Sequence, residues 1–127
     1  MNNLGLCFCG SAISFQDCCE KYINGTQKAP TALALMKSRY SAYATHQVDY
    51  LLITTHSSQR KYYSKAHILN WATANEWQKL EIISSTEKTV EFKAYFLDEN
   101  KQRQIHHEFS TFKKENDSWF YVDGTFK

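Results

Sequence analysis

Apolar residues repeat with helical spacing in the first half of the chain. Thr31 is a candidate N-cap. After it, one helical face at positions i, i+3, i+7 and i+10 consists of Leu33, Met36, Tyr40 and Tyr43. This spacing predicts an amphipathic helix over 31–46. The period continues from Val48 to Thr55 and returns over 64–75, which predicts a short second helix and a third one.

The second half of the chain alternates with a period of two residues, which is typical of strands. Four stretches show this pattern, rich in β-branched and aromatic residues: 79–84, 90–96, 105–110 and 119–122. The polar segments between them are short, so successive strands are expected to pair as antiparallel hairpins. Three helices followed by a four-stranded antiparallel sheet make an α+β domain.

The first 26 residues have a different character. They are rich in Cys, Gly and Asn and hold too few apolar side chains for a core of their own. The segment 24–30 that follows is a predicted turn, because Asn24-Gly25 favours positive φ and Pro30 turns Ala29 away from helix. We therefore expect two units, 1–26 and 31–127.

Composition limits the classes of partner and the compartment. The 127 residues are 43% hydrophobic, which suffices for one domain with a core, and 15 Lys plus Arg against 13 Asp plus Glu leave a formal charge of +2. Such a charge singles out neither a nucleic acid nor an anionic membrane. The start of the sequence lacks the basic region and apolar run of a signal peptide, and no apolar run is long enough for a membrane span. The expected location is the cytoplasm.

All four cysteines fall within thirteen residues, as Cys7-x-Cys9, eight residues, then Cys18-Cys19. In a reducing compartment this density favours metal ligands, and Zn²⁺ accepts four thiolates tetrahedrally at about 2.3 Å. Such a closed site is structural because no position is left for water. A turn at Gly10-Ser11 is expected to aim a backbone amide at a sulfur. Two disulfides, an iron–sulfur cluster or four unliganded thiols remain alternatives.

The segment 7–11 together with Cys18-Cys19 resembles the SEC-C motif, the zinc-binding element also found at the C-terminus of the SecA translocase. Further stretches look like the YchJ family of bacterial proteins: 22–25, 29–32, 35–43, 49–51, His107-Glu108, Phe112 and 119–124. The resemblance covers nearly the whole chain. It implies an N-terminal SEC-C zinc motif followed by a nuclear transport factor 2-like domain, a cone of helices laid on a curved antiparallel sheet. It implies no activity.

The sequence departs from the family pattern in three places. Phe8 stands where the motif usually has Pro, and 12–14 replace a Gly-Lys-Lys-like stretch, so the basic residues that would suit a nucleic acid are missing. Many relatives carry a second SEC-C motif at the C-terminus, whereas this sequence ends at Lys127. Neither nucleic-acid binding nor a bivalent role is therefore expected.

The fold that the resemblance implies often encloses a cavity, which relatives such as ketosteroid isomerase and scytalone dehydratase use for catalysis. The polar and aromatic residues that could line one are Arg39, Tyr43, His56, Tyr95, His107 and Glu108. Arg39 borders the apolar face of its helix, about 40° from Tyr43. His107 and Glu108 point to opposite faces of their strand, so at most one of them can face a shared cavity. The plainer interpretation is that Arg39 pairs with a carboxylate and that the histidines are ordinary polar residues.

Two functions from different classes follow. In the first, the zinc unit is an interaction or adaptor module that presents Phe8, Phe15 and Tyr22 to a protein partner, unless these rings dock onto the cone. In the second, the cone is a small-molecule carrier or an enzyme with Arg39 as anion anchor. The sequence offers no nucleophile with a recognisable partner, no phosphate-binding glycine loop and no carboxylate pair, so an enzyme is not the favoured expectation. A homodimer is an open alternative.

Overall fold

The order of the elements is helices first and strands second. The computed structural model describes residues 5–127, so the first four residues of the predicted 1–26 unit lie outside the described part. The elements are α1 (Glu20–Ile23), α2 (Ala32–Ala44), α3 (Val48–Ile53), a 3-10 turn η1 (Arg60–Tyr62), α4 (Lys65–Ala74), β1 (Glu76–Ser85), β2 (Thr89–Leu97), β3 (Arg103–Glu115) and β4 (Ser118–Phe126). The predicted α+β class is confirmed. The sequence pattern missed only α1 and η1, each about one turn long, because so short a stretch shows no period.

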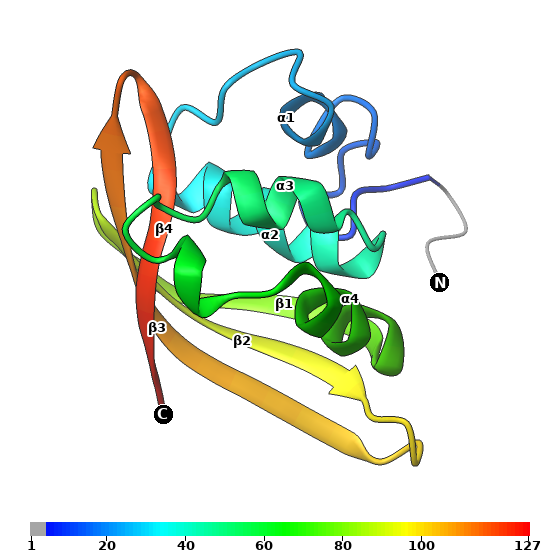
Figure 1. The fold of residues 1–127 in the computed structure, drawn as a ribbon. Helices are drawn as coiled ribbons and strands as arrows, with labels where there is room; N and C mark the ends of the chain where they lie inside the picture. Colours follow the sequence, from blue (N-terminus) through cyan, green and yellow to red (C-terminus); the bar gives the residue numbers. More distant parts are fainter. Residues whose placement is uncertain (1–4) are drawn as a thin grey trace.

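The four strands form one antiparallel sheet in the order β1-β2-β3-β4, as the hairpin pattern predicts. β1 has register shifts between Trp77 and Lys79 and between Ile82 and Ser84. Bulges of this kind bend a strand and increase its twist. The resulting sheet curves around the helices, with α2 and α4 lying against its inner face (Figure 1).

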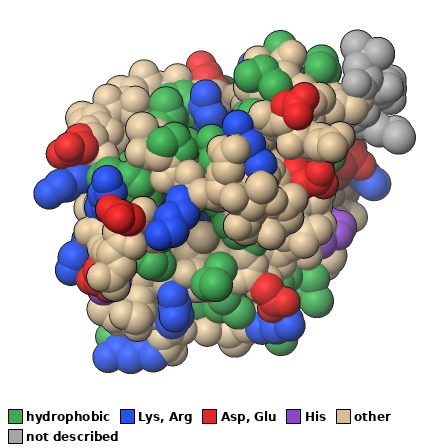
Figure 2. All heavy atoms as spheres, turned by 90° about the horizontal axis from the view of Figure 1, so that it is seen from above, with side chains coloured by type: hydrophobic (Ala, Val, Ile, Leu, Met, Phe, Trp, Pro, Cys, Tyr) green, Lys and Arg blue, Asp and Glu red, His purple; other side chains and the backbone are tan. Residues whose placement is uncertain are grey.

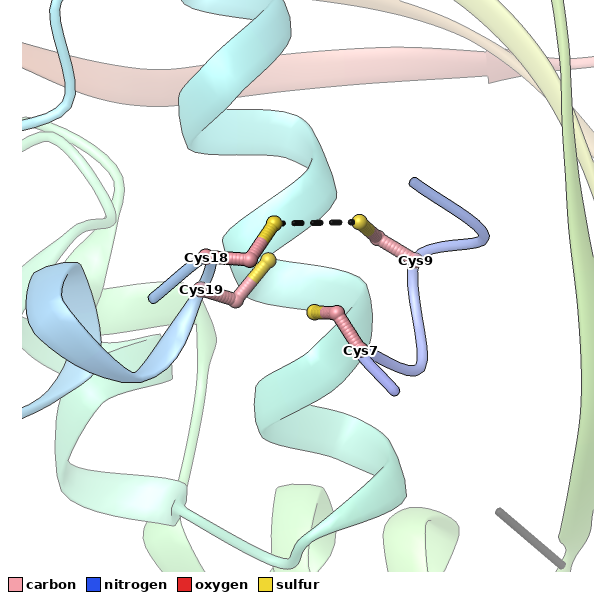
Figure 3. Close-up of side chains that lie close together, drawn as sticks. All are labelled: Cys7, Cys9, Cys18 and Cys19. Atoms are coloured by element: carbon pink, nitrogen blue, oxygen red, sulfur yellow. Dashed lines mark hydrogen bonds between the residues drawn. The ribbon is translucent and has the colours of Figure 1, made fainter. Parts of the chain in front are cut away.

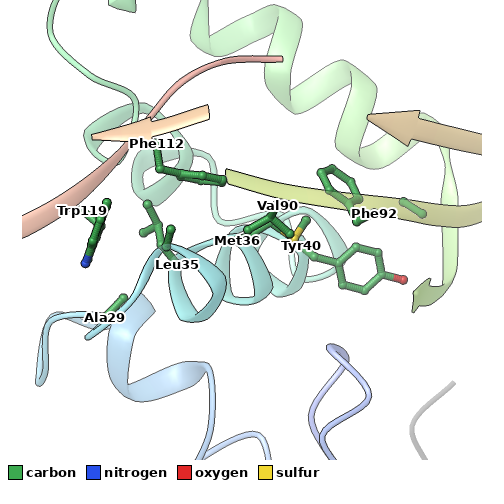
Figure 4. Close-up of a cluster of buried hydrophobic side chains, with 10 residues drawn as sticks. Ala29, Leu35, Met36, Tyr40, Val90, Phe92, Phe112 and Trp119 are labelled. Carbon is green, nitrogen blue, oxygen red and sulfur yellow. The ribbon is translucent and has the colours of Figure 1, made fainter. Parts of the chain in front are cut away.

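Helix α2 is the centre of the molecule. Thr31 caps it, since its hydroxyl accepts from the Ala34 amide at 3.0 Å. Toward the sheet the helix packs apolar side chains such as Leu35, Met36 and Tyr40 into a cluster shared with the strands (Figure 4). The strand side of that cluster is Val90, Phe92, Ala94, Phe112 and Trp119.

The opposite side of α2 is also buried, which the amphipathic pattern did not predict. Ser38, Ser41 and Ala42 are fully buried there. Ser38 donates to the Leu35 carbonyl at 2.7 Å and lies 2.6 Å from the Tyr50 hydroxyl of α3. These short side chains let α3 and the cysteine-bearing loop approach the helix closely. The Ser38 hydroxyl bonds within the helix, and the Ser41 hydroxyl contacts Cys7. A scale that counts serine as polar therefore underestimates how deeply α2 is buried.

No helix among residues 5–127 combines the length and the hydropathy that a bilayer-spanning segment needs. The face seen in Figure 2 mixes Lys and Arg with Asp and Glu and shows no continuous patch of one charge. This agrees with the small net charge of +2.

Candidate metal centre and cavity

The four cysteines converge on one point beside α2. Cys7 and Cys9 come from the first loop, and Cys18 and Cys19 directly precede α1 (Figure 3). Their four sulfur atoms all lie within 4.8 Å of one another, and Cys9 Sγ is 3.7 Å from Cys18 Sγ. A tetrahedral site with metal–sulfur bonds of about 2.3 Å requires sulfurs roughly 3.8 Å apart. The cluster therefore has the donors and the spacing to bind one metal ion.

Hydroxyl groups surround the sulfurs. Ser11 Oγ lies 3.1 Å from Cys18 Sγ, and Ser41 Oγ of α2 lies 3.5 Å from Cys7 Sγ. The predicted turn exists, with Gly10 at φ 86° and its amide donating to the Cys7 carbonyl at 3.2 Å. The Cys9 backbone hydrogen-bonds the Cys7 thiol, as expected of this turn, and the Ser11 hydroxyl contacts Cys18, whereas the Gly10 amide is used by the turn itself.

Electrostatics also favour a cation at this point. Hydrogen bonds with Cys19 and Cys9 lower the pKa of the Cys7 thiol, whereas Cys7 and Cys9 raise the pKa of Cys19. One thiolate is thus readily formed, and the next is opposed by it. A metal ion removes this conflict because it neutralises the thiolates together.

The aromatic rings of the N-terminal unit point inward. Phe8 and Tyr22 pack against the main core cluster, and Phe15 packs against the cysteines. Phe8 and Phe15 also meet edge to face, with ring centres 5.5 Å apart. The structure therefore uses these three rings for packing, the alternative that the sequence left open.

A second feature is a cavity of about 440 Å³ between the helices and the inner face of the sheet. Its walls are mainly aromatic: Tyr40, Tyr43, Tyr63, Trp71, Trp77, Phe92, Phe112, Tyr121 and Phe126. Its polar lining is Arg39, Thr55, His67, His106, Glu108 and Ser110. Trp71 is 38% exposed and Phe126 is 72% exposed, so aromatic side chains also form its rim. The volume lies in the range of small-molecule sites.

Arg39 lies in this cavity as a buried cation. Its Nη1 donates to the Leu51 carbonyl at 3.0 Å and to Thr54 Oγ1 at 2.7 Å, and its guanidinium carbon lies 4.6 Å from the centre of the Tyr121 ring. The predicted pairing with a carboxylate is wrong for the described residues, since none lies within 4.0 Å of Arg39. Within residues 5–127, Nε and Nη2 have no hydrogen-bond acceptor.

Glu108 is the buried carboxylate of the cavity, and three donors hold it. His106 Nε2 lies 2.7 Å from Oε1, while the hydroxyls of Ser110 and Tyr121 donate to Oε2 at 2.6 and 2.9 Å. Burial raises the pKa of Glu108, but the hydrogen bonds from these three donors outweigh burial, and the net pKa is lowered. Glu108 is therefore ionised at neutral pH.

The carboxylate of Glu108 has room because a bulge in β4 places a glycine beside it. The register between β3 and β4 shifts by one residue, so that Phe112 faces Tyr121 and Thr111 faces Asp123. This bulge at Val122 brings Tyr121 and Gly124 to the same face of β4. A methyl group at Gly124 would overlap the Glu108 carboxylate. Glycine at this position thus makes room for the charge.

Three of the six predicted cavity residues lie elsewhere. His56 bonds Glu115 at 3.1 Å and packs on Phe120, on the other side of the Thr55–Tyr121 bridge. Tyr95 and His107 belong to the outer face of the sheet, where they bond Glu81 and Glu91 at 2.6 and 2.8 Å. The other three, Arg39, Tyr43 and Glu108, are brought together by the cavity.

The sequence reasoning missed His106, Tyr121 and Gly124. The alternation of the strand could have predicted His106, because it lies two residues from Glu108 and therefore shares its face. An isolated glycine in a strand is also a sign of close approach. Three polar residues, His106, Glu108 and Ser110, point inward, whereas Ile105, 56% exposed, points outward, which reverses what hydrophobicity suggests.

Comparison with known proteins agrees with both parts of the molecule. Residues 31–124 match the family model described as the middle NTF2-like domain of YchJ. A UPF0225 protein of Geobacter sulfurreducens is 38% identical over 126 residues, covering 94% of this chain and 78% of the relative. A UPF0225 protein of Serratia proteamaculans is 40% identical over 134 residues, covering 94% and 82%.

Two solved structures share the fold. The solution structure of a SEC-C motif containing protein from Rhodopseudomonas palustris has a TM-score of 0.86 and 33% identity, covering 94% of this chain and 96% of the other. The crystal structure of such a protein from Psychrobacter arcticus has a TM-score of 0.81 and 31% identity, covering 98% and 83%. Together with the cysteine cluster and the antiparallel sheet, these matches show that the chain belongs to the YchJ family.

Proposed function

We propose that this protein binds an anionic, partly aromatic small molecule in the cavity, and that the four cysteines hold a structural Zn²⁺ which fixes the N-terminal unit to α2. The observation that carries the proposal is Arg39, a buried cation in an aromatic cavity with no carboxylate partner among residues 5–127. A buried charge that touches no carboxylate is costly, and a ligand anion in contact with Arg39 would lower that cost.

The polar groups that lack protein partners favour such a ligand. Arg39 has two nitrogen atoms without acceptors, and the Tyr43 hydroxyl has no hydrogen-bond partner in the described part of the chain. Glu108, by contrast, already accepts three hydrogen bonds. Arg39 and the Tyr43 hydroxyl therefore offer hydrogen-bond donors to a ligand, and what these donors lack is an acceptor such as a carboxylate. The aromatic walls favour an apolar or aromatic remainder.

The binding test uses the three tryptophans as reporters. Trp71 and Trp77 line the cavity, whereas Trp119 lies outside it and donates to the Pro30 carbonyl. Aromatic carboxylates, including indole-3-acetate and phenylpyruvate, are titrated against the zinc-loaded protein and followed by indole ¹⁵N–¹H NMR. The expected result is that the signals of Trp71 and Trp77 shift and that of Trp119 does not. The primary amide of each compound should bind at least tenfold more weakly, because it lacks the charge that Arg39 attracts.

Two variants complete this test. Arg39→Met should remove the preference for the carboxylate, while Lys37→Met removes a charge from the same helix outside the cavity and should keep it. Equal binding of acid and amide to the unmodified protein, or no shift of Trp71 and Trp77 with any of these compounds, would refute the proposal. The comparison of acid with amide needs no variant, so it stays valid if Arg39→Met fails to fold.

The adaptor hypothesis takes second place. It was based on three aromatic residues that a small unit cannot bury by itself. In the structure these residues, Phe8, Phe15 and Tyr22, all pack against the core or the cysteines. A Phe15→Ala variant should therefore lose stability. If it kept zinc and stability but lost a co-purifying protein, a protein partner at the zinc unit would become the better proposal.

A further inference from the structure

We infer that His106 and Glu108 form an acid–base dyad, with His106 as the base that removes a proton from carbon next to the carbonyl group of the bound anion. This inference rests on the proposed ligand cavity and extends it from binding to catalysis. The two residues are neighbours on the inner face of β3, and both line the cavity.

The hydrogen bond between them fixes the tautomer of the imidazole. Glu108 is ionised and can only accept, so His106 Nε2 carries the proton that it shares with Oε1 at 2.7 Å. The neutral ring then has its lone pair on Nδ1. Within residues 5–127 this nitrogen has no hydrogen-bond partner. An imidazole held through one nitrogen by a buried carboxylate, with the other nitrogen left basic, is the arrangement of a general base.

Neighbouring side chains contact both members of the dyad. Ser110 and Tyr121 occupy the second oxygen of Glu108, so that Oε1 is left for His106. Three rings lie around the imidazole, which stays 28% exposed: Trp71 at 6.4 Å, Phe92 at 6.2 Å and Phe126 at 5.0 Å between ring centres. Glu108 touches no ligand in this scheme and acts as a positioning residue, whereas His106 is the catalytic residue.

The reaction needs no other reactant. His106 Nδ1 takes a proton from the carbon, the C–H electron pair forms a carbon–carbon double bond, and the carbonyl π pair moves to oxygen. The unpartnered donors of Arg39 and Tyr43 are available to this oxygen or to the ligand's own anionic group. Delivery of the proton to the oxygen gives the enol. When the proton on His106 first exchanges with solvent, return of a solvent-derived proton to carbon gives isotope exchange. The net change is a tautomerisation, so atoms and electrons balance.

Phenylpyruvate is a suitable probe, because it joins an aromatic ring and a carboxylate to an acidic CH₂ group. Exchange of its benzylic protons in dilute buffered D₂O is followed by ¹H NMR with the zinc-loaded protein. The expected result is exchange that is faster than in buffer and that falls about 100-fold or more in His106→Gln, the range typical of a lost general base. Glutamine can still donate to Glu108, so this variant is expected to fold.

His107→Gln is the matched control, since His107 lies on the outer face of the same strand. It should leave the rate unchanged. Glu108→Gln should lower the rate and move its pH profile, which a purely structural role would not do. Ring ¹⁵N NMR should find the proton of neutral His106 on Nε2; a proton on Nδ1 would overturn the inference.

The outcomes separate the two proposals. If phenylpyruvate shifts Trp71 and Trp77 but exchanges no faster than in buffer, the dyad is refuted and ligand binding stands. If exchange survives in His106→Gln, His106 is not the base. If phenylpyruvate does not bind, the dyad inference fails, and the proposed function fails with it unless another of the aromatic carboxylates shifts Trp71 and Trp77.

Discussion

The guanidinium group of Arg39 lies over the ring of Tyr121, with 4.6 Å between its carbon and the ring centre, and the hydroxyl of the same tyrosine donates to Glu108 at 2.9 Å. One side chain therefore touches both charges of the cavity. Its position is fixed by the backbone, because Tyr121 pairs with Thr54 and His56 after α3 through hydrogen bonds of 2.8 Å. The cation comes from a helix and the anion from a strand, and Tyr121 links them.

Tyr121→Phe separates the two contacts, because it keeps the ring under Arg39 and removes the hydroxyl. The free energy of unfolding should fall by about 1.5–3 kcal/mol, the range for a buried hydrogen bond to a charged group. Urea denaturation measures this. Tyr95→Phe is the control, since it removes a hydroxyl that bonds Glu81 on the outer face. If Tyr121→Phe lowered the free energy of unfolding no more than Tyr95→Phe does, the hydrogen bond to Glu108 would not stabilise the fold as expected.

Gly124→Ala should destabilise the protein by about 1–3 kcal/mol, a cost typical of overpacking. The added methyl group would displace the Glu108 carboxylate. In a Glu108→Ala background the same substitution should cost less, because the clash has gone, and a double-mutant cycle measures the difference. Thr125→Ala, at an exposed neighbouring position, should cost little in either background. Additive effects of Gly124→Ala and Glu108→Ala would mean that the two residues are not in contact.

Acid should weaken the fold partly through Glu108. Its pKa is lowered on folding, so the ionised form contributes stability above the ordinary glutamate pKa of about 4.3, and this contribution is lost as the pH falls through the folded pKa. Glu108→Gln should be less stable at pH 7 and should lose less stability than the unmodified protein between pH 7 and pH 3. Glu87→Gln, on the exposed β1–β2 turn, should keep the original pH dependence. Parallel curves for Glu108→Gln and the unmodified protein would contradict the assignment.

Purified under reducing conditions, the protein should contain about one zinc per chain, because four thiolates complete the tetrahedral coordination of Zn²⁺. A chelator should unfold the unit up to residue 26 while the sheet stays folded. Amide hydrogen exchange would measure this as a loss of protection in the N-terminal unit alone. The unfolding midpoint of the remainder should also fall, because Phe8 and Tyr22 leave the main core.

Ser11→Ala offers a milder test, since it removes the hydroxyl 3.1 Å from Cys18 Sγ and should weaken zinc binding about tenfold. For the unmodified protein purified under reducing conditions, a content below about half a zinc per chain would refute the zinc assignment.

Local patterns were sufficient to predict most of the fold. Helical spacing located α2, α3 and α4, alternation located all four strands, and short polar turns gave their antiparallel order. The cysteine spacing located the candidate metal centre, because its ligands are close in the sequence. Such features depend on neighbours along the chain, which a sequence displays directly.

The cavity depends on contacts between distant segments, and there the sequence was less informative. Alternation could not place Tyr121 and Gly124 on one face, because the bulge at Val122 shifts the register. Hydrophobicity could not place Glu108 inside, because its burial is compensated by donors from 106, 110 and 121. His56 was assigned inward because the sequence does not reveal that the segment after α3 turns along β4.

Helix α2 carries Ser41 against Cys7 and, two residues away, Arg39 and Tyr43 in the wall of the cavity. Two binding events that order the same helix are thermodynamically linked, and linkage works equally in both directions. In the proposed scheme, metal binding raises the affinity for the small molecule, and the small molecule raises the affinity for the metal by the same factor. On this view the amount of zinc available to a cell would determine how much of this protein can hold its ligand.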